Sequence, residues 1–238
     1  YGDYYALVIG NNDYELLPDL ETAVNDATKV ASVLEYDYGF KVELLKNASR
    51  GEILKSLFGY RKIVGERDNL LIYYAGHGVE IDGLNYLVPT SVPFDNERYL
   101  KRNSLDVNEM MNYLQSRRSK INIVILDACR DNPLASENRG GPGSGVKKES
   151  VNVSSGTFLA FSTSSGKSAK DGKGGNSVYC LNLVKNIKTP NLTLETVFKR
   201  VRVQVDKQTD GYQVPTEVSK LVGDDFFFLQ EQDFSKLD

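Results

Sequence analysis

The sequence contains no tryptophan, a single histidine and only two cysteines among its 238 residues. One histidine and two cysteines cannot supply the four ligands of a closed Cys/His zinc site, so that class of metalloenzyme is excluded. Two cysteines do not make a disulfide framework either. A Cys129–Cys180 bridge and two reduced thiols both fit the sequence, and we favour the reduced state. No apolar run approaches the roughly 18 residues that a membrane-spanning helix needs.

The excess of one charge over the other is also small. The formal net charge is -3, with 29 Lys and Arg residues against 32 Asp and Glu residues, and no basic stripe is present. The composition therefore makes no electrostatic case for binding nucleic acid. The first residues, 1–5, include neither an initiator Met nor a basic stretch followed by an apolar one, so they are not a signal peptide. We expect a cytoplasmic protein, unless a targeting signal belongs to a longer natural chain.

Short apolar runs alternate with amphipathic stretches along the chain. The pattern predicts strands at 5–10, 41–45, 70–75, 121–127, 156–162 and 226–229, and helices at 20–34, 50–64, 107–114, 177–187 and 194–205. Ser49 and Glu52 predict a capping box, and Asp82-Gly83 predicts a hairpin turn within 79–88. The alternation predicts an α/β fold with a mostly parallel central sheet of about six strands, flanked by helices on both faces.

Two predicted strands end in residues with catalytic chemistry, the segments 74–78 and 126–130. Functional groups in parallel sheets cluster just past the carboxyl ends of strands, so we expect His77 and Cys129 to meet at one edge of the sheet. An imidazole can take the proton of a thiol or hold its thiolate as an ion pair. The backbone N–H groups of Gly78 and Cys129 are the natural donors to an oxyanion.

The same segments resemble the motifs of a known family. The sequence YYAGHG at 73–78 is similar to the histidine motif of the caspase, metacaspase and bacterial orthocaspase group, and LDACR at 126–130 is similar to its cysteine motif. His77 and Cys129 lie 52 residues apart (129 − 77), close to the roughly 50 residues typical of caspases. Further segments agree with this family. Residues 25–27 resemble the early Asn-Asp motif of metacaspases, 161–177 resemble the family's substrate-cleft segment, and 213–215 and 223–226 resemble its C-terminal ending.

The resemblance implies a caspase-haemoglobinase fold and a cysteine-type endopeptidase. It also implies one domain over 1–238, with a large-subunit-like part at about 1–131, a flexible connecting loop at 132–155 and a small-subunit-like part at 156–238. The sequence assigns no third catalytic residue.

Substrate preference follows from the residue two positions before Cys129. Caspases proper carry Gln there and cleave after Asp, whereas this chain carries Asp127. In metacaspases, acids that match Asp26 and Asp127 line the pocket for the residue before the cleaved bond, so the resemblance implies cleavage after Arg or Lys. Asp171 is a further candidate for the cleft. A solvated helix acid is the alternative interpretation for Asp26, and a strand-end cap for Asp127.

Two features of the sequence bear on regulation. Arg139, Lys147 and Lys148 lie among glycines in 132–155 and are candidate self-cleavage sites, with an uncut surface loop as the alternative. Some metacaspases need calcium, but Asp95 and Glu97 offer too few oxygen ligands to make a site for a hard cation. We therefore expect no metal and no cofactor.

Two main hypotheses for the function remain. The first is an active endopeptidase whose substrates are polypeptides with a basic residue before the cleaved bond. The alternative is a catalytically silent caspase-like domain that serves as an interaction or scaffold module. A third, weaker option is a cysteine hydrolase of the same fold that acts on small amides. The presence of both His77 and Cys129 favours the first hypothesis, and a regulatory domain or partner protein would fit it.

Overall fold

Strands and helices alternate along the chain as its apolar pattern predicts. The computed structural model describes residues 2–92, 97–115, 119–129, 151–164 and 175–230. The strands are β1 (Tyr4–Gly10), β2 (Lys41–Lys46), β3 (Asn69–Gly76), β4 (Gly78–Ile81), β5 (Leu84–Leu87), β6 (Leu105–Asp106), β7 (Ile121–Ala128), β8 (Thr157–Phe161) and β9 (Thr216–Ser219). The helices are α1 (Ala23–Tyr38), α2 (Arg50–Ile63), α3 (Glu97–Asn103), α4 (Val107–Gln115), α5 (Val178–Ile187) and α6 (Leu194–Gln208).

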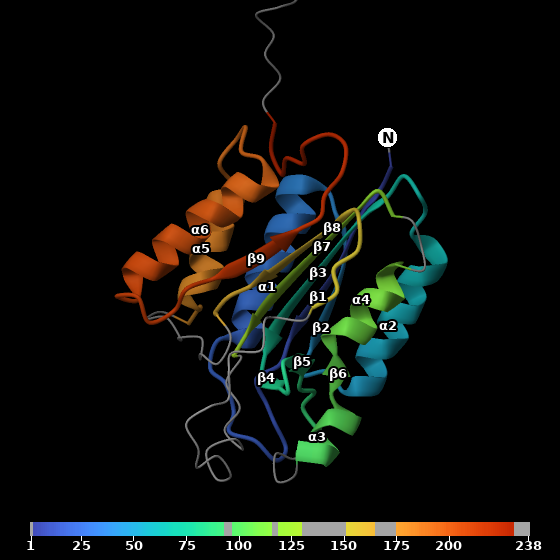
Figure 1. Ribbon diagram of the computed structural model, residues 1–238, viewed down its shortest axis with the longest axis vertical. Coiled ribbons are helices and arrows are strands. Elements are labelled where there is room, and N and C mark those ends of the chain that lie inside the picture. The colour runs from blue at the N-terminus through green and yellow to red at the C-terminus, as the bar shows by residue number, and fades with distance from the viewer. Residues whose placement is uncertain (1, 93–96, 116–118, 130–150, 165–174, 231–238) are drawn as a thin grey trace, which may run out of the picture.

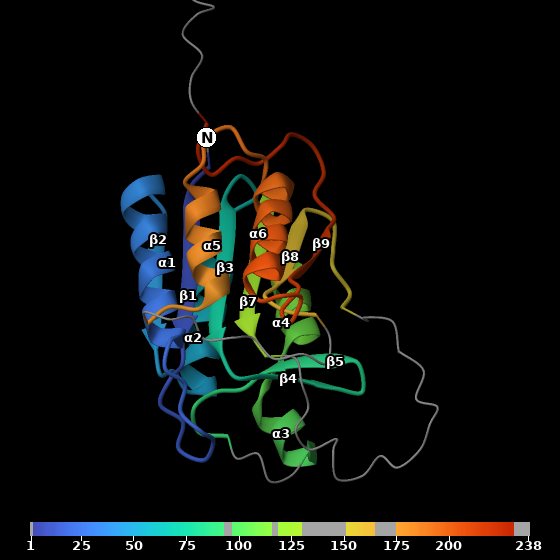
Figure 2. The same ribbon diagram turned by 90° about the vertical axis from the view of Figure 1, so that its left-hand side faces the viewer.

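The main sheet has six strands in the order β2-β1-β3-β7-β8-β9. All neighbours in it are parallel except β8 and β9, which are antiparallel. Helices α1, α5 and α6 cover one face, and α2 and α4 cover the other (Figure 1); the first of these layers faces the viewer in Figure 2. A small antiparallel sheet, β4-β5-β6, lies beside the carboxyl ends of the parallel strands. The predicted mostly parallel α/β architecture is confirmed.

Each central strand supplies apolar side chains to both faces of the sheet, because successive residues of a strand point to opposite sides. Tyr73 packs into the core under α1 and α5, whereas Tyr74 packs into the core under α2 and α4. The same alternation along β7 directs Ile125 to the first core and Leu126 to the second. Burial on both faces explains why these strands are continuous apolar runs in the sequence.

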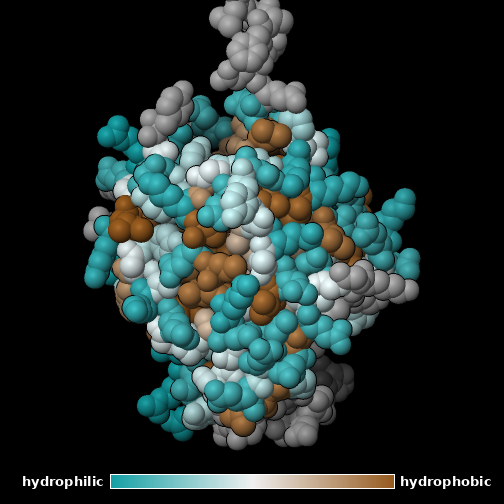
Figure 3. Space-filling model, turned by 180° about the vertical axis from the view of Figure 1, so that it is seen from behind, coloured by the Kyte–Doolittle hydropathy of each residue, from teal (hydrophilic) through white to brown (hydrophobic). Residues whose placement is uncertain are grey.

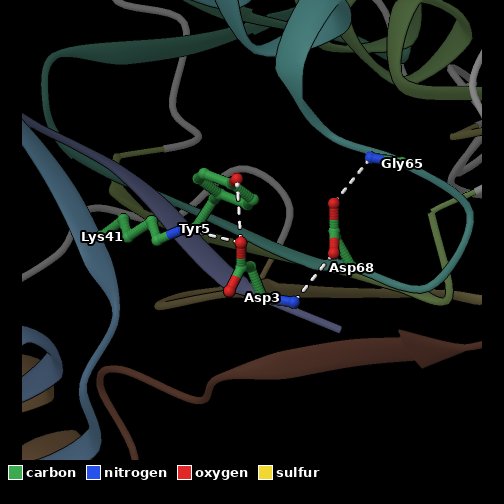
Figure 4. A network of polar contacts seen from close by, with 5 residues as sticks. All are labelled: Asp3, Tyr5, Lys41, Gly65 and Asp68. Carbon is green, nitrogen blue, oxygen red and sulfur yellow. Dashed lines mark hydrogen bonds and ion pairs between the residues drawn. The ribbon is translucent and has the colours of Figure 1, made fainter. Parts of the chain in front are cut away.

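Polar contacts connect the amino ends of three strands (Figure 4). The Asp3 carboxylate accepts from Lys41 Nζ at 2.6 Å and from the Tyr5 hydroxyl at 3.3 Å. The Asp68 carboxylate accepts from the backbone N–H groups of Asp3 and Gly65, both at 2.8 Å. Exposed pairs of this kind add little to stability. They lie at the opposite ends of the strands from His77 and Cys129.

Local signals in the sequence are confirmed. Ser49 and Glu52 form the predicted capping box at the start of α2. The turn between β4 and β5 carries positive φ angles at Asp82 (53°) and Gly83 (79°), as a tight hairpin requires. Helix α1 runs from Ala23 to Tyr38 and stops at Gly39, which has the left-handed φ of 67°.

The predicted strand at 226–229 is wrong. Phe227 forms only one isolated bridge, with Thr193, and the sixth strand of the sheet is β9. Phe226 and Phe228 pack edge to face with ring centroids 5.2 Å apart, and Phe226 is buried in the core under α1 and α6. Aromatic packing therefore accounts for this apolar run. Strand β9 was missed because its half-exposed, polar sequence TEVS carries no strong strand signal.

Hydrophobic side chains also reach the surface on the face that carries β2, between polar ones (Figure 3). A hollow of about 850 Å³ lies along this strand, and Phe40, Val42, Tyr60 and Ile63 contribute to its lining. It contains none of the predicted site residues. Among the described residues, no helix has both the length and the apolar character needed to cross a membrane.

Candidate active site

The pairing of β3 with β7 sets the positions of the two candidate catalytic residues. The strands are parallel neighbours in which Ala75 lies opposite Asp127 and Gly76 lies opposite Ala128. His77 and Cys129 are the next residue of each strand, so both leave the same edge of the sheet at the same level. Both are partly exposed. The predicted neighbourhood of the two strand ends is therefore present.

The glycine after His77 is required by the close approach of the two strand ends. A Cβ atom at Gly78 would lie 2.7 Å from the carbonyl oxygen of Cys129 and 2.9 Å from the Cβ of Ala128. Val88 donates its N–H to the His77 carbonyl at 3.0 Å, and hydrogen bonding alternates along an antiparallel pair. The N–H of Gly78 consequently points away from β5.

The imidazole of His77 is held by a backbone carbonyl. Its Nε2 lies 2.8 Å from the carbonyl oxygen of Pro18. A carbonyl oxygen can only accept, so Nε2 carries the hydrogen and Nδ1 is left as the acceptor nitrogen. The neutral ring is thereby set in the tautomer that can receive a proton at Nδ1. Sequence analysis missed Pro18, because its contribution comes from the backbone and leaves no side-chain signal.

The two candidate specificity residues, Asp26 and Asp127, are brought together by one residue at the start of α5. Ser177 donates its N–H to Asp26 at 3.0 Å (Oδ1) and 3.2 Å (Oδ2), and its hydroxyl donates to Asp127 Oδ2 at 2.9 Å. Asn176 donates to Asp26 Oδ1 at 2.8 Å, and the Tyr73 hydroxyl donates to Asp127 Oδ2 at 3.1 Å. All of these donors are electrically neutral.

Both residues are almost completely buried, with exposed fractions of 1% for Asp26 and 6% for Asp127. Burial raises the pKa of Asp26, and the hydrogen bonds from Asn176 and Ser177 oppose the rise. Burial, followed by the negative charge of Asp26, raises the pKa of Asp127 to about 7. Neither acid is solvated, so the alternative of a solvated helix acid at Asp26 does not describe the structure.

Most of the remaining predicted residues cannot be compared with this site. Asp171, Asp95 and the three candidate self-cleavage residues (Arg139, Lys147 and Lys148) lie outside the described residues, as does most of the predicted 132–155 loop. Glu97 begins α3. No group of three or more His, Cys, Asp or Glu side chains in the described segments could hold a metal ion. Cys180 is buried in α5, and it forms no disulfide with Cys129, as expected for two reduced thiols.

A family model described as the caspase domain of peptidase C14 matches residues 3–227. The chain belongs to the caspase domain family. Two curated relatives are the Mucosa-associated lymphoid tissue lymphoma translocation protein 1 of Homo sapiens and its homolog in Mus musculus. Each is 30% identical to this caspase domain over 128 residues, which is 54% of this chain and 15% of the relative. The match thus spans a small part of the relatives' length.

The fold agrees with this membership. The crystal structure of Caspase-1 from Spodoptera frugiperda matches the caspase domain with a TM-score of 0.70 at 17% sequence identity. The match covers 98% of this chain and 92% of that one. The predicted caspase-type fold is confirmed, and family membership supports a protease-type function.

Proposed function

We propose that this caspase domain is a cysteine endopeptidase that uses Cys129 as nucleophile and His77 as base, and that cleaves after Arg or Lys. The observation that carries the proposal is the register of β3 and β7, by which His77 and Cys129 leave the same edge of the sheet at the same level. The carbonyl of Pro18 supports it, because that contact leaves Nδ1 of His77 as the acceptor nitrogen.

The chemistry proceeds in two steps. Cys129 Sγ attacks the carbonyl carbon of the scissile peptide and its proton passes to His77 Nδ1, while the carbonyl π electrons move to oxygen. Collapse of the intermediate breaks the C–N bond, and the leaving amine takes the proton from His77. Water, deprotonated by His77 Nδ1, then attacks the thioester carbon. Collapse of this second intermediate breaks the C–S bond and releases the acid, and His77 returns the proton to Sγ to regenerate the thiol.

The oxyanion of each step requires hydrogen-bond donors. The N–H of Gly78, directed away from β5, and the N–H of Cys129 are the proposed donors. Gly78 has no Cβ that could shield its N–H from a substrate carbonyl, and its tight packing against the Cys129 carbonyl fixes its position beside the proposed nucleophile. Each such donor contributes on the order of 10²–10³ in rate.

The pocket for the residue before the cleaved bond is assigned to Asp26 and Asp127. Two carboxyl groups linked through Ser177 and surrounded by neutral donors cannot both ionise without cost. A guanidinium or ammonium group that contacts both acids removes that cost and forms charge-assisted hydrogen bonds. An Asp side chain in the same place would instead add a further negative charge beside the two acids.

A pair of fluorogenic peptides that differ only in Arg or Asp before the cleaved bond tests the proposal. We expect turnover of the Arg peptide and loss of that turnover in Cys129→Ala. In Asp127→Asn, kcat/KM for the Arg peptide should fall about 10- to 100-fold, the scale of one lost charge-assisted bond. Asp68→Asn is the matched control, since it changes the net charge equally at the opposite end of the strands and should leave turnover unchanged.

A folded wild-type protein that turns over neither peptide would favour the alternative, a catalytically silent interaction domain. Preference for the Asp peptide would refute the assignment of Asp26 and Asp127 while leaving the dyad intact. Labelling of Cys129 by an arginine-based chloromethyl ketone, absent in Cys129→Ala, gives an independent measurement of the same site.

A further inference from the structure

Tyr14, in the loop between β1 and α1, fills the space directly behind His77. Its hydroxyl accepts the His77 N–H at 2.7 Å and donates to the Val88 carbonyl at 3.3 Å. Paired antiparallel residues normally exchange two direct hydrogen bonds. Val88 N–H donates to the His77 carbonyl at 3.0 Å, but the return bond runs through the Tyr14 hydroxyl. The ladder is therefore opened by one side-chain hydroxyl at the backbone of His77.

The ring of Tyr14 contacts the imidazole as well. The two ring centroids are 4.5 Å apart and the planes meet at 61°, an edge-to-face arrangement. Pro18, four residues further along the same loop, supplies the carbonyl that contacts Nε2. The loop that carries Tyr14 and Pro18 therefore contacts the backbone N–H, the ring and the Nε2 atom of His77.

The loop itself is attached to the rest of the domain. Tyr14 N–H donates to Asp19 at 2.8 Å within the loop, and Glu15 N–H donates to the Thr90 carbonyl at 3.0 Å. Tyr14 is 7% exposed, and burial raises its pKa to about 12, so the hydroxyl keeps the proton that it donates to Val88.

The glycine before His77 is explained by the same contacts. A Cβ atom at Gly76 would lie 2.8 Å from the Tyr14 hydroxyl and 2.7 Å from the Tyr74 hydroxyl. The Tyr74 hydroxyl lies 2.9 Å from the His77 carbonyl and 2.8 Å from the Val88 carbonyl. Both tyrosine hydroxyls therefore converge on the backbone that carries the imidazole, and only glycine leaves room for them.

We propose that Tyr14 is a positioning residue for His77. Through one hydrogen bond and one ring contact, Tyr14 sets the direction of His77 Nδ1 toward Cys129. The inference rests on the proposed function, because it assigns the role that Tyr14 plays in the dyad. It predicts that loss of the hydroxyl alone impairs proton transfer and leaves substrate binding intact.

The test is Tyr14→Phe, which keeps the ring and removes the hydroxyl. We expect kcat for the Arg peptide to fall about 10- to 100-fold, the scale of a slightly misplaced catalytic group, with KM unchanged. The pH profile of Cys129 alkylation by iodoacetamide, which needs no substrate, should move toward that of an ordinary thiol near pH 8.5. Gly76→Ala, whose methyl group would displace both hydroxyls, should give the same two changes.

Tyr60→Phe is the matched control. Its buried hydroxyl donates to the Ala6 carbonyl at 2.9 Å, away from the candidate site, so the variant should lose stability but keep kcat and the alkylation profile. An active wild type whose kcat and alkylation profile are unchanged in both Tyr14→Phe and Gly76→Ala would overturn the role of Tyr14 alone. A wild type without turnover and with an ordinary alkylation profile would instead overturn the dyad.

Discussion

Replacement of Asp127 by Asn tests whether the buried pair of carboxyl groups reduces the stability of the folded domain. The pKa of Asp127 is raised from 3.8 to about 7, first by burial and then by Asp26. Between these pH values the folded state binds more protons than the unfolded state, so stability falls as the pH rises through this range and levels off above it. A pKa raised by roughly three units, at about 1.4 kcal/mol per unit, gives an upper value of about 4 kcal/mol for the stability lost when Asp127 ionises.

The assay is urea unfolding of both proteins at pH 5.5 and pH 8.5. The Oδ1 of Asn can still accept hydrogen bonds from Tyr73 and Ser177, which both donate to Asp127 in the wild type. Between pH 5.5 and the raised pKa, roughly 1.5 pH units of the Asp127 titration destabilise the wild type, whereas the Asn side chain of the variant does not titrate. The unfolding free energy of Asp127→Asn minus that of the wild type should therefore be about 2 kcal/mol larger at pH 8.5 than at pH 5.5.

A second variant makes this reasoning refutable. Asp26→Asn removes the negative charge that is the second cause of the raised pKa of Asp127. The pKa of Asp127 should therefore be lower in that variant, and its stability should start to fall with rising pH at a lower pH than that of the wild type. If the difference between wild type and Asp127→Asn is the same at both pH values, the carboxyl of Asp127 does not titrate in this range, and the electrostatic account of the pocket is wrong.

Three further predictions concern other parts of the molecule. Gly78→Ala places a methyl group against the Cys129 carbonyl and should lower kcat by on the order of 10² with the circular dichroism spectrum unchanged; wild-type kcat would remove Gly78 from the oxyanion site. Ser49→Ala removes the capping box of α2 and should lower the free energy of unfolding in urea by about 1 kcal/mol. Ser49→Asp, which can still cap the helix, should retain most of that stability. Intact-mass spectrometry should show cleavage after a basic residue of 132–155 in the wild type but not in Cys129→Ala. An uncut wild-type chain, which differs from the variant only by the mass of the substitution, would refute self-processing.

Hydrophobic pattern and local motifs were sufficient for most of the fold. The five parallel strands of the main sheet were predicted. Strands β1, β3, β7 and β8 are apolar runs because they are largely buried on both faces, whereas the half-exposed edge strand β2 carries a mixed sequence with three apolar residues. The sixth position was assigned incorrectly, since Phe226 and Phe228 form an apolar run that packs by aromatic contact, while β9 is short and polar. Helix α3 and the two-residue strand β6 were also missed, because neither carries a strong apolar period.

The sequence by itself determined the order of elements, the edge of the sheet where His77 and Cys129 emerge, and the choice of Asp26 and Asp127 as candidates. Residue types and their periodicity encode the first two features locally, and the resemblance to metacaspase motifs implied the third. Only the tertiary structure decided what supports them: the Pro18 carbonyl and the Tyr14 hydroxyl behind the imidazole, and Ser177 between the two acids. These contacts join segments far apart in the chain, two of them through backbone atoms, and such contacts have no signature in the order of side chains.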